Sequence, residues 1–229
     1  LMLTAIAAAA RAAGRPIHVL AAYPEIWRGN RDAASVETDL ERWLYAERRR
    51  WIATNLVHLS CRNGIRRHLA AQMADHVGVA LPAGWRPVFY VQPVQRNRRR
   101  LVVQNSCRGA RYTAVTKEWP QERWTALCAL LAQDFELVQL GTNRDPLIRQ
   151  ATDLRNRTTL AGAADCLAGA ALFIGLESGL MHLAAAVRTP AYTVSRKPPA
   201  AVDAALLEEG RLRQAAGADY IELKKKSDA

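Results

Sequence analysis

Residues 171–190 read ALFIGLESGLMHLAAAVRTP, and this stretch decides the fold that we expect for the chain. The apolar run Ala171–Ile174 is typical of a central parallel strand, which is covered on both faces. After a short turn, apolar residues recur at the spacing of one helix face at Leu180, Leu183, Ala184 and Val187. The stretch therefore predicts a strand, a turn, and a helix that begins at about Ser178 and packs back on the sheet.

The turn between this strand and this helix is a candidate site for an anion. Ser178 is a natural N-cap, and the amides of Ser178, Gly179 and Leu180 would lie at the positive end of the helix dipole. His182 comes four residues after Ser178, on the same face as the turn. The plainer alternatives are a tight turn that binds nothing and a histidine that packs in the core.

The composition is that of a globular protein. The 229 residues are 50% apolar, which is enough for one large domain or two small ones. No apolar run reaches the roughly 18 residues of a membrane-spanning helix, and the alanine-rich Leu1–Ala13 is interpreted as an amphipathic or buried helix. The four cysteines form no zinc pattern with the five histidines, so we expect free thiols in a reducing cytoplasm.

The net charge of +11 favours an anionic partner, such as a phosphorylated glycolipid, a membrane surface or nucleic acid. Basic residues cluster at Arg48–Arg50, Arg66 with Arg67, Arg96 with Arg98–Arg100, and Lys224–Lys226. No RNA-recognition or helix-turn-helix motif accompanies these clusters, so nucleic acid is the weakest of the three partners.

The N-terminal half predicts an incomplete Rossmann-like unit. Such a unit begins with a strand, whereas this chain begins with a predicted helix at Leu3–Ala13, followed by a strand at Ile17–Ala21. The half is therefore expected to be small or truncated. Its further predicted elements are helices at Thr38–Ile52 and Ile65–Val77 and strands at Asn55–Leu59 and Val88–Val91.

The C-terminal half alternates strands and helices, which predicts a parallel doubly wound sheet and an α/β fold. After a linker at Gln92–Arg100, the predicted strands are Leu101–Gln104, Phe135–Leu140, Ala171–Ile174 and Ala191–Val194. The predicted helices start at Pro120 or span Asp145–Thr152, Leu160–Ala168 after the cap Thr159, and Ala201–Ala216. We expect the sheet to be complete at Val194, the last helix to cross back, and Lys224–Ala229 to be disordered.

Two motifs carry a family resemblance. Leu167–Pro190 and the Lys117-x-Trp119-Pro120 motif resemble the signature segments of glycosyltransferase family 9, the ADP-heptose:lipopolysaccharide heptosyltransferases. The resemblance implies a GT-B type fold of two Rossmann-like halves, here residues 1–95 and 101–195, followed by the crossing helix and basic tail of residues 196–229. The residues that it implies at the donor diphosphate are Thr113, Lys117, Ser178, Gly179, Leu180 and His182.

The resemblance also implies contacts with the donor's sugar and nucleoside. Glu177 stands where the family usually has an Asp that contacts the sugar. Gly141, Thr142 and Asn143 follow a strand at the place where the family holds base and ribose, and Asn143 replaces a residue that is often acidic. Thr158 matches a position that lines the base, although it suits an ordinary helix-capping turn equally well.

The activity implied by the resemblance is the transfer of a heptose-like sugar from a nucleotide diphosphate donor, ADP-linked in the family, to a glycan or lipopolysaccharide-core hydroxyl. The transfer would invert the anomeric carbon and need neither a metal nor a cofactor. The family's presumed catalytic base is the Asp of a Gly-Asp pair, which would lie upstream of Leu1. The implied location is the bacterial cytoplasm, with peripheral contact between the basic surface and the inner membrane.

Two other functions fit the same sequence. The missing Gly-Asp pair, Glu177 and Asn143 also suit a family member that binds or assembles without catalysis. The arginine clusters suit a nucleic-acid-binding protein, although less well. The fold by itself cannot choose among these functions, because one fold hosts many sites.

Overall fold

The computed structural model describes residues 1–21, 23–39, 69–108, 118–194 and 220–223. The chain divides into two compact units, Leu1–Tyr90 and Val91–Ala229. The predicted elements at Asn55–Leu59, at Ala201–Ala216 and over nearly all of Thr38–Ile52 lie outside the described residues, as does the tail Lys224–Ala229.

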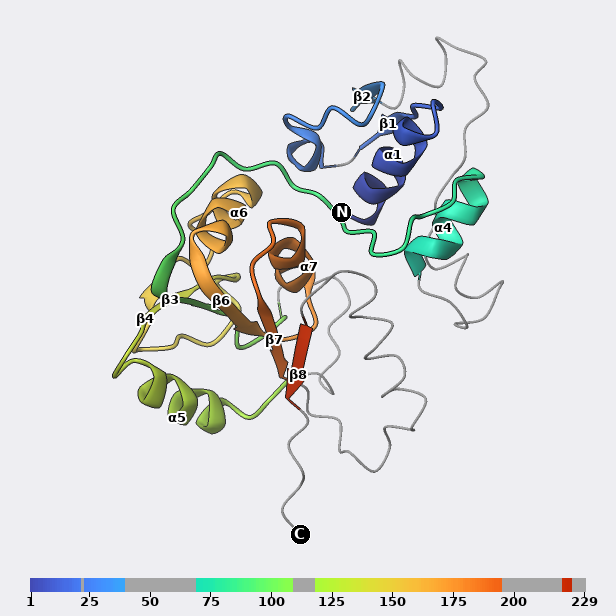
Figure 1. The fold of residues 1–229 in the computed structure, drawn as a ribbon. Helices are drawn as coiled ribbons and strands as arrows, with labels where there is room; N and C mark the ends of the chain where they lie inside the picture. Colours follow the sequence, from blue (N-terminus) through green and yellow to red (C-terminus); the bar gives the residue numbers. More distant parts are fainter. Residues whose placement is uncertain (22, 40–68, 109–117, 195–219, 224–229) are drawn as a thin grey trace, which may run out of the picture. The chain divides into compact units, whose positions relative to one another are not determined.

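The described part of the N-terminal unit contains a pair of parallel strands and two α-helices (Figure 1). Its elements are α1 (Met2–Ala12), β1 (His18–Leu20), the 3₁₀ helix η1 (Pro24–Trp27), β2 (Ser35–Glu37) and α4 (Leu69–Val77). Val19 of β1 lies opposite Val36 of β2. Helix α1 packs on α4 through a buried cluster that includes Ile6, Met73 and Ala74, because its alanine-rich face permits close approach.

Most expectations for this unit that the structure can test are confirmed. Helix α1 and strand β1 lie where the sequence predicts them, and α4 ends before Gly78, whose φ of +73° suits a residue without a side chain. The predicted strand Val88–Val91 is wrong. Val88 instead donates its N–H to Thr4 Oγ1 at 2.9 Å, so its backbone is paired with a side chain rather than with a strand.

The C-terminal unit is built on a six-stranded sheet in which all pairs are parallel. Its strands are β3 (Asn97–Val103), β4 (Glu136–Gln139), β5 (Thr152–Asp153), β6 (Ala170–Gly175), β7 (Ala191–Val194) and β8 (Tyr220–Leu223). Their order in the sheet is β5-β4-β3-β6-β7-β8, which is the strand order of the Rossmann fold. The predicted parallel doubly wound sheet is confirmed.

Helices cover both faces of this sheet. Figure 1 shows α6 (Leu160–Ala168) and α7 (Gly179–Ala186) on one face and α5 (Gln121–Leu131) on the other. Because successive residues of a strand point to opposite faces, Leu101 and Val103 join Trp124 of α5 in one buried cluster. Val102, which is fully buried, points to the face that α6 and α7 cover. The covered faces leave the ends of the strands as the place for a site.

Two boundary predictions in this unit are wrong. Residues 97–100 belong to β3 rather than to a linker, since Arg100 pairs in register with Glu136 of β4. The sheet is not complete at Val194, because β8 adds a parallel strand next to β7 and places residues 220–223 in the sheet rather than in a tail.

The predicted helix at Asp145–Thr152 is also wrong. These residues form turns that lead into β5. Pro146 lacks the N–H that a helix needs, and the N–H of Ile148 donates to Gln139 Oε1 at 2.8 Å instead of to a helical carbonyl. A buried side chain thus takes over the hydrogen bond that a helix would have made.

Candidate functional site

Strands β3 and β6 mark the point where the order of the sheet reverses. From β3 the chain continues to β4 and β5 on one side, and from β6 it continues to β7 and β8 on the other. In open α/β sheets, ligands bind in the crevice at the carboxyl ends of the strands at such a point. The residues that follow the two strands here are 104–107 after β3 and 176–179 after β6.

The turn after β6 presents backbone donors at this point. Ser178 is the N-cap of α7, as predicted, and its Oγ accepts the N–H of Met181 at 3.5 Å. The N–H groups of Gly179 and Leu180 lie in the first turn of α7, where no carbonyl of the helix can accept them. Glu177 and Gly179 are exposed. These donors and the helix dipole suit a phosphate group.

His182 lies at the end of the same first turn and is half-buried. Its backbone N–H donates to the carbonyl of Ser178 at 3.3 Å. The structure thus brings together five of the predicted site residues, which are Glu177, Ser178, Gly179, Leu180 and His182. Their contacts with a donor stay predictions.

The end of β3 contacts both neighbouring turns through two adjacent side chains. Gln104 Oε1 accepts a hydrogen bond from Ser178 Oγ at 2.5 Å, in the turn after β6. Asn105 Oδ1 accepts one from Gln139 Nε2 at 2.9 Å, at the end of β4. Gln104 is 7% exposed and Asn105 is 2% exposed, so both bonds are sheltered from water. Strand β3 therefore holds the two turns in a fixed relation.

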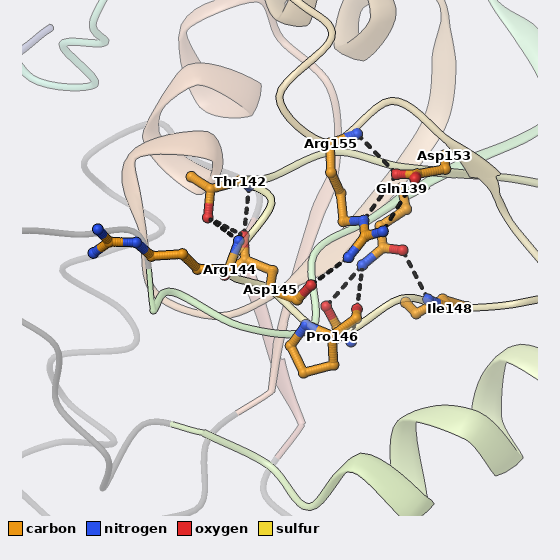
Figure 2. A network of polar contacts seen from close by, with 9 residues as sticks. Gln139, Thr142, Arg144, Asp145, Pro146, Ile148, Asp153 and Arg155 are labelled. Carbon is orange, nitrogen blue, oxygen red and sulfur yellow. Dashed lines mark hydrogen bonds and ion pairs between the residues drawn. The ribbon is translucent and has the colours of Figure 1, made fainter.

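A network of side-chain amides closes the turn after β4. Gln139 is fully buried, and Figure 2 shows its amide between Pro146 and Ile148. Its Nε2 donates to the Pro146 carbonyl at 2.8 Å, and its Oε1 accepts the Ile148 N–H. Asn105 Nδ2 donates to the same carbonyl at 2.9 Å and to Gln121 Oε1 of α5 at 3.0 Å. Both amides have partners for nitrogen and oxygen, so the network fixes one arrangement of the turn.

Asp145 orders the turn in which the sequence predicts a nucleoside site. Its Oδ2 accepts hydrogen bonds from Thr142 N at 2.6 Å and from Thr142 Oγ1 at 3.2 Å (Figure 2). Gly141 has a φ of +144°, and a Cβ at this position would collide with Asp145 Oδ2, so the turn requires glycine. Asn143 is exposed beside this turn, while Thr142 is half-buried. Their contacts with base and ribose stay predictions.

Arg155 links the turn after β4 to strand β5 through hydrogen bonds. Its Nη1 donates to the carbonyl of Asp145, and its Nε and Nη2 donate to Asp153 Oδ1 at 2.8 Å and Oδ2 at 3.0 Å (Figure 2). The hydrogen bonds from Arg155 lower the pKa of Asp153 to about 2. The next residue, Asn156, donates its N–H to the carbonyl of Gly141 at 2.8 Å.

The described part of the Lys-x-Trp-Pro motif, residues 118–120, contacts a residue that follows β3. Thr113 and Lys117 themselves lie outside the described residues, so their contacts with the diphosphate stay predictions. Glu118, which follows Lys117, accepts a hydrogen bond from Ser106 Oγ at 2.7 Å. Its other carboxylate oxygen lies 3.1 Å from Nε of Arg108.

The tryptophans of this segment pack into the core. Trp124 is fully buried, and its ring meets that of Trp119 edge to face, with 5.4 Å between the centroids. The guanidinium of Arg123 lies 6.0 Å from the centre of the Trp119 ring. This packing anchors α5 and the motif on the sheet, as the apolar face of α5 predicts.

Thr159 caps α6, as predicted, and its Oγ1 accepts the N–H of Gly162 at 3.1 Å. Helix α6 has the predicted bounds Leu160–Ala168. Thr158 is half-buried beside this cap. Its contact with a base stays a prediction.

The described cysteines are thiols, as expected. Cys107 and Cys128 are buried and Cys166 is partly buried, while Cys61 lies outside the described residues. Burial raises the pKa of Cys128 to about 11, which keeps this thiol protonated. Among the described residues, no group of three or more His, Cys, Asp or Glu side chains could hold a metal ion.

Sequence patterns miss three residues that organise the site: Gln104, Asn105 and Asp145. Gln104 is expected only as the last residue of a strand, and Asp145 only as the first residue of a helix. A signal was present in each case, because each polar side chain stands within a few residues of the carboxyl end of an apolar strand. In a parallel sheet these ends share one edge.

The sequence model of glycosyltransferase family 9 (heptosyltransferase) matches residues 90–197. This segment contains β3 to β7 and the turns that follow β3, β4 and β6. The match covers a little under half of the chain, and over these residues the chain is similar to glycosyltransferase family 9. The resemblance carried by Leu167–Pro190 and by the Lys-x-Trp-Pro motif is thereby confirmed.

A curated relative supports the same family. Lipopolysaccharide heptosyltransferase 1 of Pseudomonas aeruginosa is 37% identical over 87 residues, which cover 34% of this chain and 24% of the relative. The match therefore spans about a quarter of the length of that heptosyltransferase.

Two solved structures from Escherichia coli share the fold. ADP-heptose lipopolysaccharide heptosyltransferase II has a TM-score of 0.59 at 13% identity, over 99% of this chain and 87% of that chain. Heptosyltransferase WaaC with ADP has a TM-score of 0.54 at 17% identity, over 94% of both chains. At such identities the likeness shows the fold, and it confirms the predicted GT-B class. The truncation of the N-terminal half stays a prediction.

Proposed function

We propose that the chain is a glycosyltransferase that moves a heptose-like sugar from an ADP-linked donor to a hydroxyl of a glycan or lipopolysaccharide core. The observation that carries this proposal is the turn after β6, where the amides of Ser178, Gly179 and Leu180 meet the positive end of α7 at the switch point of the sheet. The family 9 match over residues 90–197 and the name of the P. aeruginosa relative, a heptosyltransferase, support the reaction class.

The proposed reaction is a single displacement that inverts the anomeric carbon. The bond from this carbon to the diphosphate oxygen breaks as the acceptor oxygen attacks from the opposite face, and negative charge develops on the leaving diphosphate. The amides of the turn after β6 and the ammonium of Lys117 stabilise that charge without a metal ion. A general base takes the proton of the acceptor hydroxyl.

The turn after β4 is the proposed place of the nucleoside. Thr142 and Asn143 lie at the same edge of the sheet as the diphosphate turn, on the other side of β3. The Asn143 amide can hydrogen-bond a ribose hydroxyl, and Thr158 would line the base. Glu177, exposed in the diphosphate turn, is then next to the sugar that leaves.

The proposed acceptor is an anionic glycan or glycolipid at the inner surface of the cytoplasmic membrane. The net charge of +11 favours such an acceptor and peripheral contact with anionic lipid. Among the described residues, no helix has the length and apolar character to cross a membrane.

Two N-caps provide a matched pair of variants to test this proposal. Ser178→Ala and Thr159→Ala each remove a cap, so we expect each to lower the free energy of unfolding by about 1 kcal/mol. Only Ser178→Ala disturbs the diphosphate turn, and we expect it alone to weaken ADP binding by roughly tenfold, a change of about 1.4 kcal/mol. Calorimetric titration with ADP and urea unfolding of the full chain measure the two effects.

Transfer itself is tested by incubating the chain with ADP-heptose and lipopolysaccharide-core acceptors and measuring released ADP. Release that requires both substrates supports the transferase. Binding of ADP-heptose without release in the presence of acceptor favours the alternative of a binding or assembly protein. No binding of ADP or ADP-heptose, together with retention on DNA at moderate salt, would refute the proposal in favour of nucleic-acid binding.

A further inference from the structure

A hollow of about 480 Å³ lies at the amino end of β3, whereas the turns proposed for the donor lie at the carboxyl edge of the sheet. Its lining residues are consecutive and all polar: Gln95, Arg96, Asn97 and Arg98. The seven residues of β3 separate its two ends by about 20 Å at the rise of a strand. A ligand in this hollow would therefore occupy a site of its own.

A bulge in β3 displays the arginines next to this hollow. The register between β3 and β6 shifts between Asn97 and Leu101. As a result, the three residues Arg98–Arg100 lie opposite the single residue Ala171 of β6. The extra residues of a bulge are unpaired in the ladder, and their side chains depart from the regular alternation of a strand. The first two of these arginines are accordingly exposed.

The two arginines that line the hollow have no carboxylate partner among the described residues. Arg96 Nη2 donates to the backbone carbonyl of Arg188 at 2.8 Å, and this neutral acceptor leaves the charge of Arg96 uncompensated. Arg98 forms no hydrogen bond or ion pair with any part of the chain that the structure describes. Its guanidinium is therefore available to a ligand.

Glu136, at the amino end of β4, is engaged by other residues. Its Oε2 accepts a hydrogen bond from Asn97 Nδ2 at 3.1 Å and lies 3.7 Å from Nη2 of Arg100. Arg100 still has an open donor, since its Nε is buried without a hydrogen-bond partner. The guanidinium groups at this end of β3 repel one another, and an anion among them would relieve that repulsion.

We propose that the hollow binds a phosphate group through the guanidinium groups of Arg96 and Arg98. Arginine presents paired N–H donors that match two oxygens of a phosphate, and Gln95 adds a neutral donor. The lining contains no apolar or aromatic side chain, so it suits a compact anion rather than a base or an acyl chain. The ligand class is a phosphate monoester, which occurs both in soluble sugar phosphates and in lipid head groups. The site does not depend on the proposed transfer reaction.

The alternative is a group of solvated arginines that only support the fold. That role fits Arg96, whose hydrogen bond to the Arg188 carbonyl holds the turn after α7. Among the described residues, Arg98 makes no such bond, so Arg98→Gln removes a charge without removing a contact. The matched control is Arg86→Gln, which removes the same charge at an exposed position of the N-terminal unit.

The first test is calorimetric titration of the full chain with glycerol 3-phosphate, with ADP in excess to fill the proposed donor site. In Arg98→Gln we expect the affinity for glycerol 3-phosphate to fall about three- to fivefold, because an exposed ion pair contributes less than a buried one. Arg86→Gln should bind as the unaltered chain does. Urea unfolding should give equal stabilities for the two variants, so that a loss of affinity is not a loss of folding.

Vesicles of phosphatidylcholine, with and without phosphatidic acid, distinguish a soluble phosphate from a lipid head group. Binding of glycerol 3-phosphate that depends on Arg98 assigns a soluble phosphate to the hollow. Sedimentation with phosphatidic acid vesicles that depends on Arg98, without binding of glycerol 3-phosphate, assigns a lipid head group. Either result supports the phosphate site.

Three results would overturn the site: equal affinities of Arg98→Gln and the unaltered chain, no binding of either phosphate probe, or retention on DNA that Arg98→Gln abolishes while neither probe binds. The last of these assigns the arginines to nucleic acid. The proposed function is judged separately, by titration of the unaltered chain with ADP alone. Absence of ADP binding would refute the proposed donor and leave the phosphate site to be decided by Arg98→Gln.

Discussion

The turns after β4 and β6 lie at one edge of one sheet, on either side of β3, and they use their polar groups in opposite ways. In the turn after β4, the amides of Asn105 and Gln139 pair with each other and with backbone groups. In the turn after β6, Ser178 caps α7 and binds Gln104, while the first N–H groups of α7 remain open. The side-chain amides of the first turn are satisfied within the protein, although Asp145 Oδ1 there is buried without a hydrogen-bond partner. The second turn offers backbone donors to a ligand.

This difference predicts different consequences of substitution. Side chains of the closed turn act on the folded state itself, so their loss should lower stability. Donors of the open turn gain their partner only with a ligand, so their loss should lower affinity with little change in stability. The following variants test this division, beginning with the one that has the largest expected effect.

Gln139→Leu should have the largest effect on stability. It leaves the N–H of Ile148 and Oδ1 of Asn105 buried without partners, and unsatisfied groups of this kind cost about 1–3 kcal/mol each. We expect a loss of about 3 kcal/mol in the free energy of unfolding, measured with urea. The exposed Gln133→Leu is the control and should change stability by less than about 0.5 kcal/mol. Equal effects of the two variants would contradict a closed amide network.

Gly141→Ala and Gly179→Ala compare one glycine from each turn. At Gly141 the positive φ and the nearby Asp145 carboxylate exclude a Cβ, so we expect a loss of about 2 kcal/mol. At Gly179 no atom lies within 4 Å of an added Cβ, and alanine is tolerated in the first turn of a helix. Its stability should therefore stay within about 1 kcal/mol of the unaltered chain. Thermal unfolding of both variants decides whether only the turn after β4 requires glycine.

Loss of the ion pair between Asp153 and Arg155 should have the smallest effect on stability, present at neutral pH and lost in acid. The pKa of Asp153 is about 2, below its usual value of 3.8, so folding favours the charged carboxylate. The stability that follows is present above about pH 4 and is lost as the pH falls toward 2. Asp153→Asn should be slightly less stable at pH 7, and the difference should shrink from pH 4 downward and in high salt. A constant difference across this range would mean that the pair does not act through its charge.

Periodic segments of the sequence predict the fold of the C-terminal unit well. The apolar run of β6, the cap Thr159 and the helix pattern of α6 and α7 each depend on neighbouring residues, so they can be read from the chain alone. The closed turn after β4 cannot be read in this way. Its geometry comes from Gln139 and Asn105, which are 34 positions apart and meet only after β3 and β4 have paired.

The same division holds for the candidate site, where local patterns could be predicted and long-range contacts could not. Ser178, Gly179 and Leu180 could be placed from the local strand, turn and helix pattern. Gln104 could not, because its contact with Ser178 crosses 74 positions of sequence. Strand β8 was missed for a related reason, since a four-residue strand at the edge of a sheet carries too short a pattern to distinguish it from a tail.

The consecutive residues Gln104 and Asn105 fix the distance between two neighbouring turns of the sheet edge. Gln104 contacts the turn after β6 and Asn105 contacts the end of β4, so a single peptide unit sets the spacing between these two turns. Both stand before the long connection from β3 to α5. Changes in the length or sequence of the later part of that connection would therefore leave the distance between the two turns unchanged. Inserting one residue after Val103 would instead displace Gln104 and Asn105 from their hydrogen-bond partners in both turns.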